Sequence, residues 1–286
     1  RQIALGEADC VLAGGVESMS RAPYVLAKAQ KAYPVGGLQA QDTTLGWRFK
    51  NPKLEALFPL EAMGCTAENL VDDYAISRAD QDAYALASQN KALAAIDAGD
   101  FAREIVAIEV AHRKHSETVD TDEGPRRGSS LESLAKLRPA FRRGGSVTAG
   151  NSSTLNDGAA ALLVCGRDFA LDQGLTIRAT IRSVASSGVD PTRMGIGPVP
   201  ASRLALKRAG LTVNDLDLVE LNEAFAAQSL ACVRALELDP DKVNVRGGAI
   251  ALGHPLGCSG ARVLATLLHA MEDRNAQLGL ATLCVG

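Results

Sequence analysis

The residues best suited to chemistry lie near the end of the chain, around one histidine. Segment 247–260, Gly-Gly-Ala-Ile-Ala-Leu-Gly-His-Pro-Leu-Gly-Cys-Ser-Gly, holds His254 between a glycine and a proline, and a helix-like run follows it. A histidine fixed in this way can act as a base or as an oxyanion donor near neutral pH. Cys284 adds a thiol, and Gly286 adds an exposed N–H group. A histidine, a thiol and a free N–H together suggest acyl transfer.

Three further segments could contribute to such a site. Asn222 and Glu223 lie where a strand runs into a helix, so Asn222 is either an ordinary helix cap or an amide that points into a cleft. Glu17, after a glycine pair, either buttresses a neighbouring loop or is a plain turn carboxylate. The polar loop 148–153 could pack against a pantetheine-like chain, although its composition alone indicates only a turn.

A pair of histidines has the spacing of metal ligands but a poor context. His112 and His115 lie in a charged segment in which we expect no further ligand nearby. We therefore predict no metal site.

The elements that must position these residues alternate between strands and helices. Such alternation is typical of an α/β protein with buried sheets. A long stretch without periodicity, 21–60, interrupts the order and indicates a functional or assembly region. The expected strands are 9–15, 159–165, 176–187, 216–221, 243–245 and 278–284, and the expected helices are 66–74, 77–98, 202–209, 223–236 and 259–274.

Composition excludes several classes of protein. The 286 residues are 47% hydrophobic and 22% charged, which is the balance of a globular protein with a large core. A net charge of −3 argues against a nucleic-acid or membrane surface. The six cysteines are widely spaced, so we expect a reducing cytoplasm rather than a disulfide scaffold. The sequence has no apolar run of about 18 residues, so we expect no transmembrane helix.

Read together, the segments resemble the thiolase family over essentially the whole chain. The ordered blocks that carry the resemblance are 14–19 (Gly-Gly-Val-Glu-Ser-Met), 63–69, 77–82, 137–141, 148–151, 155–160, 222–225, 247–260 and 284–286 (Cys-Val-Gly).

The resemblance implies a five-layer α-β-α-β-α sandwich of two similar halves with an inserted loop domain. Residues 1–20 would end the first half, 21–146 would form the loop domain, 147–170 would return to the first half, and 171–286 would form the second half. The first half would be incomplete. The family implies a homodimer or homotetramer in the cytoplasm that acts on CoA and acyl-CoA thioesters, with coenzyme A as substrate and no separate cofactor.

The resemblance also implies roles for individual residues. His254 would take the proton of a nucleophilic cysteine, and Cys284 would be a second thiol that moves a proton at the acetyl carbon or at the CoA sulfur. Asn222 would hold a water that forms one oxyanion hole with His254, and the N–H of Gly286 would serve the other. The residues implied to bind CoA are Leu54, Met63, Arg126, Ser133, Phe141, Ala149, Ser153, Ala224 and Phe225.

Two departures leave alternatives open. The family's nucleophile stands in a Cys-x-Ser-Gly turn that would precede Arg1; Cys10 lies inside an expected strand, and Cys258 matches a different loop. The family's last strand is also missing, so we expect the chain to be a fragment that is inactive alone, or an acyl-CoA-binding protein without turnover. Ala62, where acetoacetyl-specific members usually have histidine, favours degradative 3-ketoacyl-CoA thiolysis over biosynthesis. Cys284 argues against a ketoacyl synthase.

Overall fold

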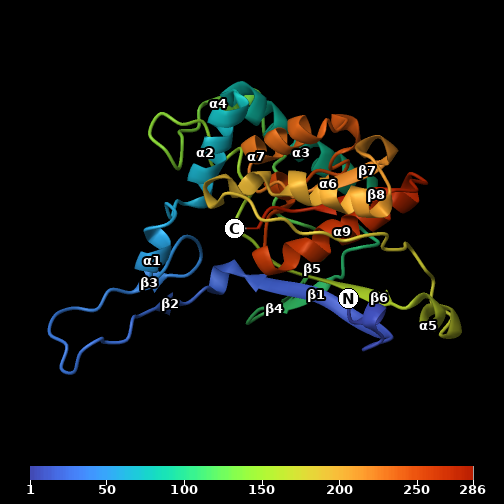
Figure 1. The fold of residues 1–286 in the computed structure, drawn as a ribbon, viewed down its shortest axis with the longest axis horizontal. Coiled ribbons are helices and arrows are strands. Elements are labelled where there is room, and N and C mark those ends of the chain that lie inside the picture. Colours follow the sequence, from blue (N-terminus) through green and yellow to red (C-terminus); the bar gives the residue numbers. More distant parts are fainter. Residues whose placement is uncertain (286) are drawn as a thin grey trace.

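The computed structural model describes residues 1–285. A single long helix, α9 (Leu256–Asp273), lies at its centre and contacts two small sheets (Figure 1). On one side it contacts the antiparallel pair of β1 (Cys10–Ser18) and β6 (Asp157–Cys165). On the other it contacts the parallel pair of β7 (Leu218–Leu221) and β8 (Gly279–Thr282). Helices α6 (Pro198–Ala209) and α7 (Ala226–Leu236) pack beyond this second sheet, so strand and helix layers alternate.

Close contact between β1 and the start of α9 explains Gly15 of β1. A Cβ at Gly15 would lie 1.8 Å from the carbonyl oxygen of Gly257, so any side chain there would push the helix off the sheet. The side chains on the other face of the β1–β6 pair, Leu12, Val16 and Leu163, are each more than half exposed.

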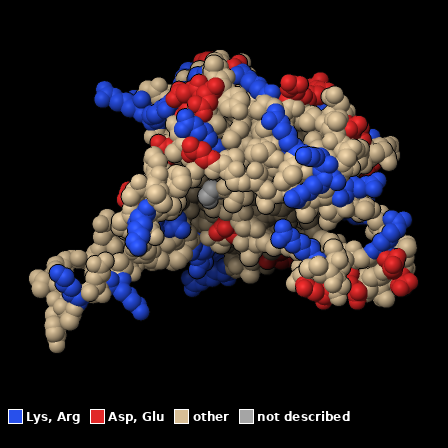
Figure 2. Space-filling model, viewed as in Figure 1, with Lys and Arg blue, Asp and Glu red and all other residues tan. Residues whose placement is uncertain are grey.

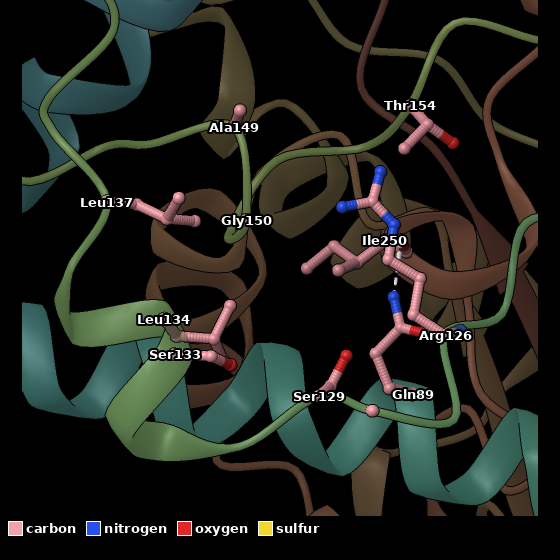
Figure 3. A pocket seen from close by; sticks show the side chains of 11 residues that line it. Gln89, Arg126, Ser129, Ser133, Leu134, Leu137, Ala149, Gly150, Thr154 and Ile250 are labelled. Atoms are coloured by element: carbon pink, nitrogen blue, oxygen red, sulfur yellow. Dashed lines mark hydrogen bonds between the residues drawn. The ribbon is translucent and has the colours of Figure 1, made fainter.

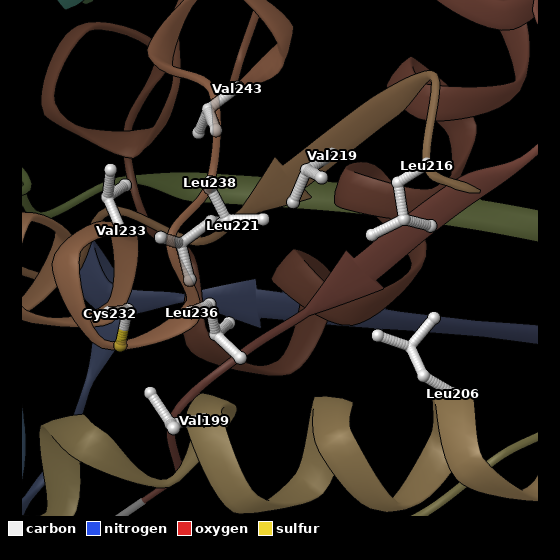
Figure 4. Packing of buried hydrophobic residues seen from close by; sticks show 10 residues of the cluster. All are labelled: Val199, Leu206, Leu216, Val219, Leu221, Cys232, Val233, Leu236, Leu238 and Val243. Atoms are coloured by element: carbon white, nitrogen blue, oxygen red, sulfur yellow. The ribbon is translucent and has the colours of Figure 1, made fainter. Parts of the chain in front are cut away.

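The second half has its own apolar core between the parallel sheet and two helices (Figure 4). Both strands carry buried residues, as expected for parallel strands covered by helices. Apart from Cys232 of α7, every member of the cluster is aliphatic: Val199, Leu206, Leu216, Val219, Leu221, Val233, Leu236, Leu238 and Val243.

The remaining elements lie between β1 and β6 or connect the other strands and helices. Helices α2 (Met63–Tyr74) and α3 (Arg78–Ala98) both pack against α7, whereas α1 lies in a projecting segment with β2 and β3 (Figure 1). None of the helices described over residues 1–285 is long and apolar enough to cross a membrane. The other bounds are β2 (Tyr24–Val25), β3 (Gln41–Asp42), α1 (Pro52–Glu55), β4 (Ile108–Ala111), β5 (Ser116–Val119), α4 (Leu131–Ala135), α5 (Arg167–Asp172) and α8 (Ala249–Leu252), with 3-10 turns at Ile3–Leu5, Met19–Arg21, Pro191–Ile196, Val213–Asp215 and Pro240–Lys242.

Most predicted elements are present, and two predicted strands are wrong. Residues 176–187 have an extended composition but form no strand, because no neighbouring strand within residues 1–285 supplies a ladder of hydrogen bonds. Residues 243–245 make only isolated bridges, one of them between Val219 and Val243. The helix expected from residue 223 begins later, at Ala226.

Candidate active site

The loop that carries His254 is held by backbone geometry. Gly253 has a φ of +97°, and a Cβ there would lie 2.3 Å from the side chain of Asn156. The His254 N–H donates to the carbonyl of Thr154 at 3.3 Å, which ties this loop to segment 148–156. The sequence Gly-His-Pro therefore fixes one orientation of the histidine.

The His254 imidazole has a partner on each nitrogen. Ser259 Oγ lies 2.6 Å from Nδ1 and donates its own proton to the Pro255 carbonyl at 2.9 Å, so it accepts from an Nδ1–H. Nε2 then carries the lone pair and accepts from Asn222 Nδ2 at 3.3 Å. Burial lowers the pKa of His254 to about 4, with the Arg262 cation adding to the effect. The ring is therefore neutral at pH 7, with Nε2 free to accept a proton.

Asn222 is not a helix cap. The cap position of α7 is Phe225, and no side chain caps that helix. Asn222 is only 1% exposed, and it directs its amide nitrogen at His254 instead. Its Oδ1 has no hydrogen-bond partner among the described residues. A buried amide oxygen without a partner is costly, and a bound water or ligand satisfies such a group.

Cys284 follows β8 and is buried in an apolar cluster. Its neighbours include Val147, Phe225 and the half-buried Met63. Burial raises the pKa of the Cys284 thiol to about 12, so this group holds its proton at neutral pH. Gly286, predicted as an oxyanion donor, lies outside the described residues.

A cavity of about 330 Å³ opens beside the His254 loop (Figure 3). Thr154, whose carbonyl accepts from His254, is part of its wall. Gln89 of α3 organises one side: its Oε1 accepts from the Arg126 N–H at 2.7 Å, and its Nε2 donates to the Ile250 carbonyl at 3.2 Å. Of the predicted CoA-binding residues, this cavity is lined by Arg126, Ser133 and Ala149.

Three other predicted CoA-binding residues, Met63, Ala224 and Phe225, belong to the cluster around Cys284, and Phe141 and Ser153 contact members of that cluster. Phe141 and Phe225 make an edge-to-face contact with ring centres 5.8 Å apart. The Ser153 N–H donates to the carbonyl of Ala224 at 3.0 Å, and Met63 packs on the cluster that contains Cys284. Leu54 is not brought to either group: it lies on α1, in the projecting segment, 37% exposed (Figure 1).

Sequence reasoning gave no role to three side chains that organise the site and its cavity: Gln89, Ser259 and Glu223. Ser259 was assigned only to the start of a helix, yet it holds the His254 ring. Glu223 is 1% exposed and accepts from Ser88 Oγ at 2.6 Å, Asn244 Nδ2 at 2.8 Å and the Ile250 N–H at 3.1 Å. The signal in the sequence that could have indicated the role of Glu223 is its place shortly after the end of a buried strand. The role suggested for Glu17 is confirmed, because its Oε2 accepts from the Gly257 N–H at 3.0 Å.

The paired histidines lie at the turn of a hairpin that the sequence did not predict. The turn joins β4 to β5 and brings Glu117 to 3.3 Å from His112 Nε2, so the expectation that no further ligand is nearby was wrong. The His112 and His115 rings stack with centres 4.7 Å apart, and the side chains of His112, His115 and Glu117 are exposed.

On the face drawn in Figure 2, basic and acidic side chains are interspersed around a largely uncharged central area.

The layered α/β fold, the neutral histidine and the buried thiol are features that an acyltransferase needs. The chain belongs to the thiolase family: its residues 1–168 match the thiolase N-terminal domain, and residues 175–286 match the thiolase C-terminal domain.

Known relatives support this membership along the full chain. The beta-ketoadipyl-CoA thiolase of Pseudomonas aeruginosa is 52% identical over 288 residues, covering 100% of this chain and 72% of the relative. The acetyl-CoA acetyltransferase of Escherichia coli is also 52% identical, covering 99% and 71%. Human mitochondrial 3-ketoacyl-CoA thiolase in complex with CoA superimposes with a TM-score of 0.92 at 44% identity, covering 100% of this chain and 70% of that one. The predicted thiolase-type sandwich is thereby confirmed.

Proposed function

We propose that the protein cleaves a 3-ketoacyl-CoA with CoA, giving acetyl-CoA and an acyl-CoA shortened by that unit, and that it catalyses the reverse condensation. The observation that carries this proposal is the His254–Asn222 pair, in which the unprotonated Nε2 lies 3.3 Å from the amide nitrogen. A neutral imidazole accepts the proton of an attacking thiol, and the resulting imidazolium stabilises the thiolate.

The remaining steps need a second acid–base group and oxyanion donors. Cys284 holds its proton at rest because burial raises its pKa to about 12, so it can donate to the acetyl carbanion that C–C cleavage produces. Asn222 places an amide beside His254 for a water that binds the thioester oxygen, and the Gly286 N–H serves the second oxyanion. Each such donor is worth roughly 2.7–4 kcal/mol of barrier in comparable enzymes. The nucleophilic cysteine would come from a Cys-x-Ser-Gly turn, which residues 1–286 do not contain.

CoA would lie across two groups of residues. Arg126, Ser133 and Ala149 line the cavity, and in this proposal Arg126 and Ser133 contact the nucleotide end of CoA. Phe141, Phe225 and Met63 then enclose the pantetheine arm on its way to Cys284.

The test is thiolysis by the complete gene product that carries this chain, followed as consumption of the 3-ketoacyl-CoA. We expect Cys284→Ala to lower kcat at least 100-fold, because a positioned acid or base contributes about 10²–10⁴. Cys232→Ala is the matched control, since this cysteine is also buried with a pKa of about 12 but belongs to the apolar core of the second half. Normal turnover by Cys284→Ala would refute the proposed role.

Substrate choice is a second part of the proposal. Ala62, in place of the histidine of acetoacetyl-specific members, favours the degradative branch, whereas acetyl-CoA acetyltransferases at 52–53% identity favour the biosynthetic alternative. Comparing kcat/KM for 3-ketoadipyl-CoA, acetoacetyl-CoA and a longer 3-ketoacyl-CoA decides between them. A preference for acetoacetyl-CoA of tenfold or more would support the biosynthetic branch.

Binding without turnover is the other alternative. Its support is that His254 hydrogen-bonds to Asn222 and Ser259 among the described residues, rather than to a cysteine. Calorimetric CoA binding without any thiolysis by the complete gene product would establish it. A homodimer or homotetramer and a cytoplasmic location remain parts of the proposal, which light scattering and cell fractionation test.

A further inference from the structure

Two cysteines far apart in the sequence face each other across the β1–β6 ladder. Cys10 is the first residue of β1 and Cys165 the last of β6, and their Sγ atoms lie 3.2 Å apart. Both side chains are only half-buried. Neither belongs to the candidate active site.

The register of the ladder favours a bond between them. The Gly166 N–H donates to the Asp9 carbonyl at 2.8 Å, so residues 9 and 166 form a hydrogen-bonded pair. Because hydrogen-bonded and non-hydrogen-bonded pairs alternate in an antiparallel ladder, Cys10 and Cys165 form a non-hydrogen-bonded pair. Such pairs bring Cα atoms to about 4.5 Å, which lies within the range that a disulfide spans. Shortening the sulfur separation from 3.2 Å to about 2.05 Å then needs only side-chain adjustment.

We propose that Cys10 and Cys165 are a thiol pair that a disulfide oxidant such as oxidised glutathione converts into an intrachain disulfide. One of the two protein thiolates attacks one sulfur of the oxidant, the oxidant's S–S bond breaks, and one glutathione thiolate leaves. The other protein thiolate then attacks the protein sulfur of the mixed disulfide and expels the second glutathione. Both protein protons pass to the leaving thiolates, so two thiols are oxidised and one disulfide is reduced.

Either thiol can act first, because either Sγ can donate its proton in the contact between them. The thiolate is the attacking species in exchange, so the thiol that loses its proton first attacks the oxidant and the other resolves the mixed disulfide.

The bond would act on the fold rather than on the chemistry. It would join the strands that begin and end residues 10–165, a loop that contains the whole inserted region, and such a long loop gives a large constraint on the unfolded chain. The contact of β1 with the His254 loop is made at the other end of the strand, where Glu17 accepts from Gly257. Seven residues of strand separate Cys10 from Glu17 by about 23 Å. We therefore expect a stabilised protein with an unchanged site.

The experiment maps the bond in the complete gene product. The protein is incubated with oxidised glutathione, unreacted thiols are alkylated, and trypsin is added without reductant. The expected product links peptide 2–21 to peptide 144–167, each of which contains one cysteine, with a mass lower by two hydrogen atoms than the two free peptides. Cys10→Ser and Cys165→Ser abolish the link, whereas Cys65→Ser, which changes a half-buried cysteine outside the ladder, retains it.

Two results would overturn the proposal: alkylation of both thiols after oxidation, or a glutathione adduct on either cysteine that never resolves into the linked peptide. Thermal unfolding gives a second measurement. The oxidised protein is expected to unfold about 5–10 °C above the reduced one. Cys165→Ser should show no such rise while matching the reduced protein, which separates loss of the bond from misfolding. An equal unfolding temperature for oxidised and reduced protein with the link present would refute the stabilising role.

Discussion

Replacing Ser259 with alanine removes the oxygen that holds the Nδ1 side of the His254 ring, 2.6 Å away. Ser259 is fully buried, so no bulk water replaces it. The ring then has two options, and each has a cost. If Nδ1 keeps its proton, a buried N–H is left without an acceptor. If the proton moves to Nε2, two donors, Nε2–H and the Asn222 amide, face each other at 3.3 Å.

The magnitude follows from either option. An unsatisfied buried donor costs about 1–3 kcal/mol, which corresponds to a loss of roughly 5- to 150-fold in kcat/KM if the lost energy falls on the reacting tautomer. The assay is thiolysis by the complete gene product, with imidazole ¹⁵N chemical shifts as the direct report of the tautomer. The variant should show a fall in kcat/KM together with a shifted or mixed ¹⁵N pattern.

Ser202→Ala is the matched control for this prediction. Ser202 is also a buried helical serine, and its hydroxyl donates to Thr282 Oγ1 at 3.2 Å, away from the imidazole. Removing it tests the general cost of losing a buried hydroxyl. Unchanged kcat/KM and unchanged ¹⁵N shifts in Ser259→Ala would show that the serine does not set the tautomer, and the reasoning would fail.

Three further predictions concern stability. Gly253→Ala places a Cβ 2.3 Å from Asn156 in a backbone conformation (φ +97°) that only glycine adopts easily, so chemical denaturation should show a loss of about 2 kcal/mol or more. Because burial lowers the folded-state pKa of His254 from 6.5 to about 4, the unfolded chain binds the proton first, and about 3 kcal/mol of stability present above pH 6.5 is lost as the pH falls to 4. Urea titrations at each pH should show this slope in the wild type and a shallower one in His254→Gln. Glu220 behaves oppositely: burial raises its pKa from 4.5 to about 8, so up to about 5 kcal/mol is lost as the pH rises between these values, and Glu220→Gln should flatten that decline.

Local signals predicted the helices better than the strands. Helix α3 begins where Ser77 accepts from the Asp80 N–H at 3.0 Å and ends at Gly99, whose φ of +77° is left-handed, and both residues are readable from the sequence. Residues 176–187 have the composition of a strand but remain irregular, because a strand also needs a neighbour, and composition does not say whether one is present.

The candidate site was predictable where a residue type carries its own chemistry. His254, Asn222 and Cys284 were singled out as candidates from type and sequence context, their roles were implied by the resemblance to the thiolases, and Glu17 was singled out from its position after a glycine pair. Ser259 and Gln89 were missed because a serine or glutamine becomes informative only through its partner. Those partners, the His254 ring and the Arg126 N–H, are set by tertiary contacts that no local pattern encodes.

The parallel sheet explains why residues 222, 254 and 284 gather at one edge. Strands β7 and β8 run in the same direction, and the Asn222 N–H donates to the Thr282 carbonyl at 3.0 Å, so the chain leaves both strands at the same edge. Helix α9 precedes β8 and returns across the sheet, which brings its first turn, and His254 just before it, to that edge. Reactive groups of open α/β sheets concentrate at the carboxyl ends of their strands for this reason. One helix, α9, and one strand, β8, therefore separate His254 from Cys284 in the sequence.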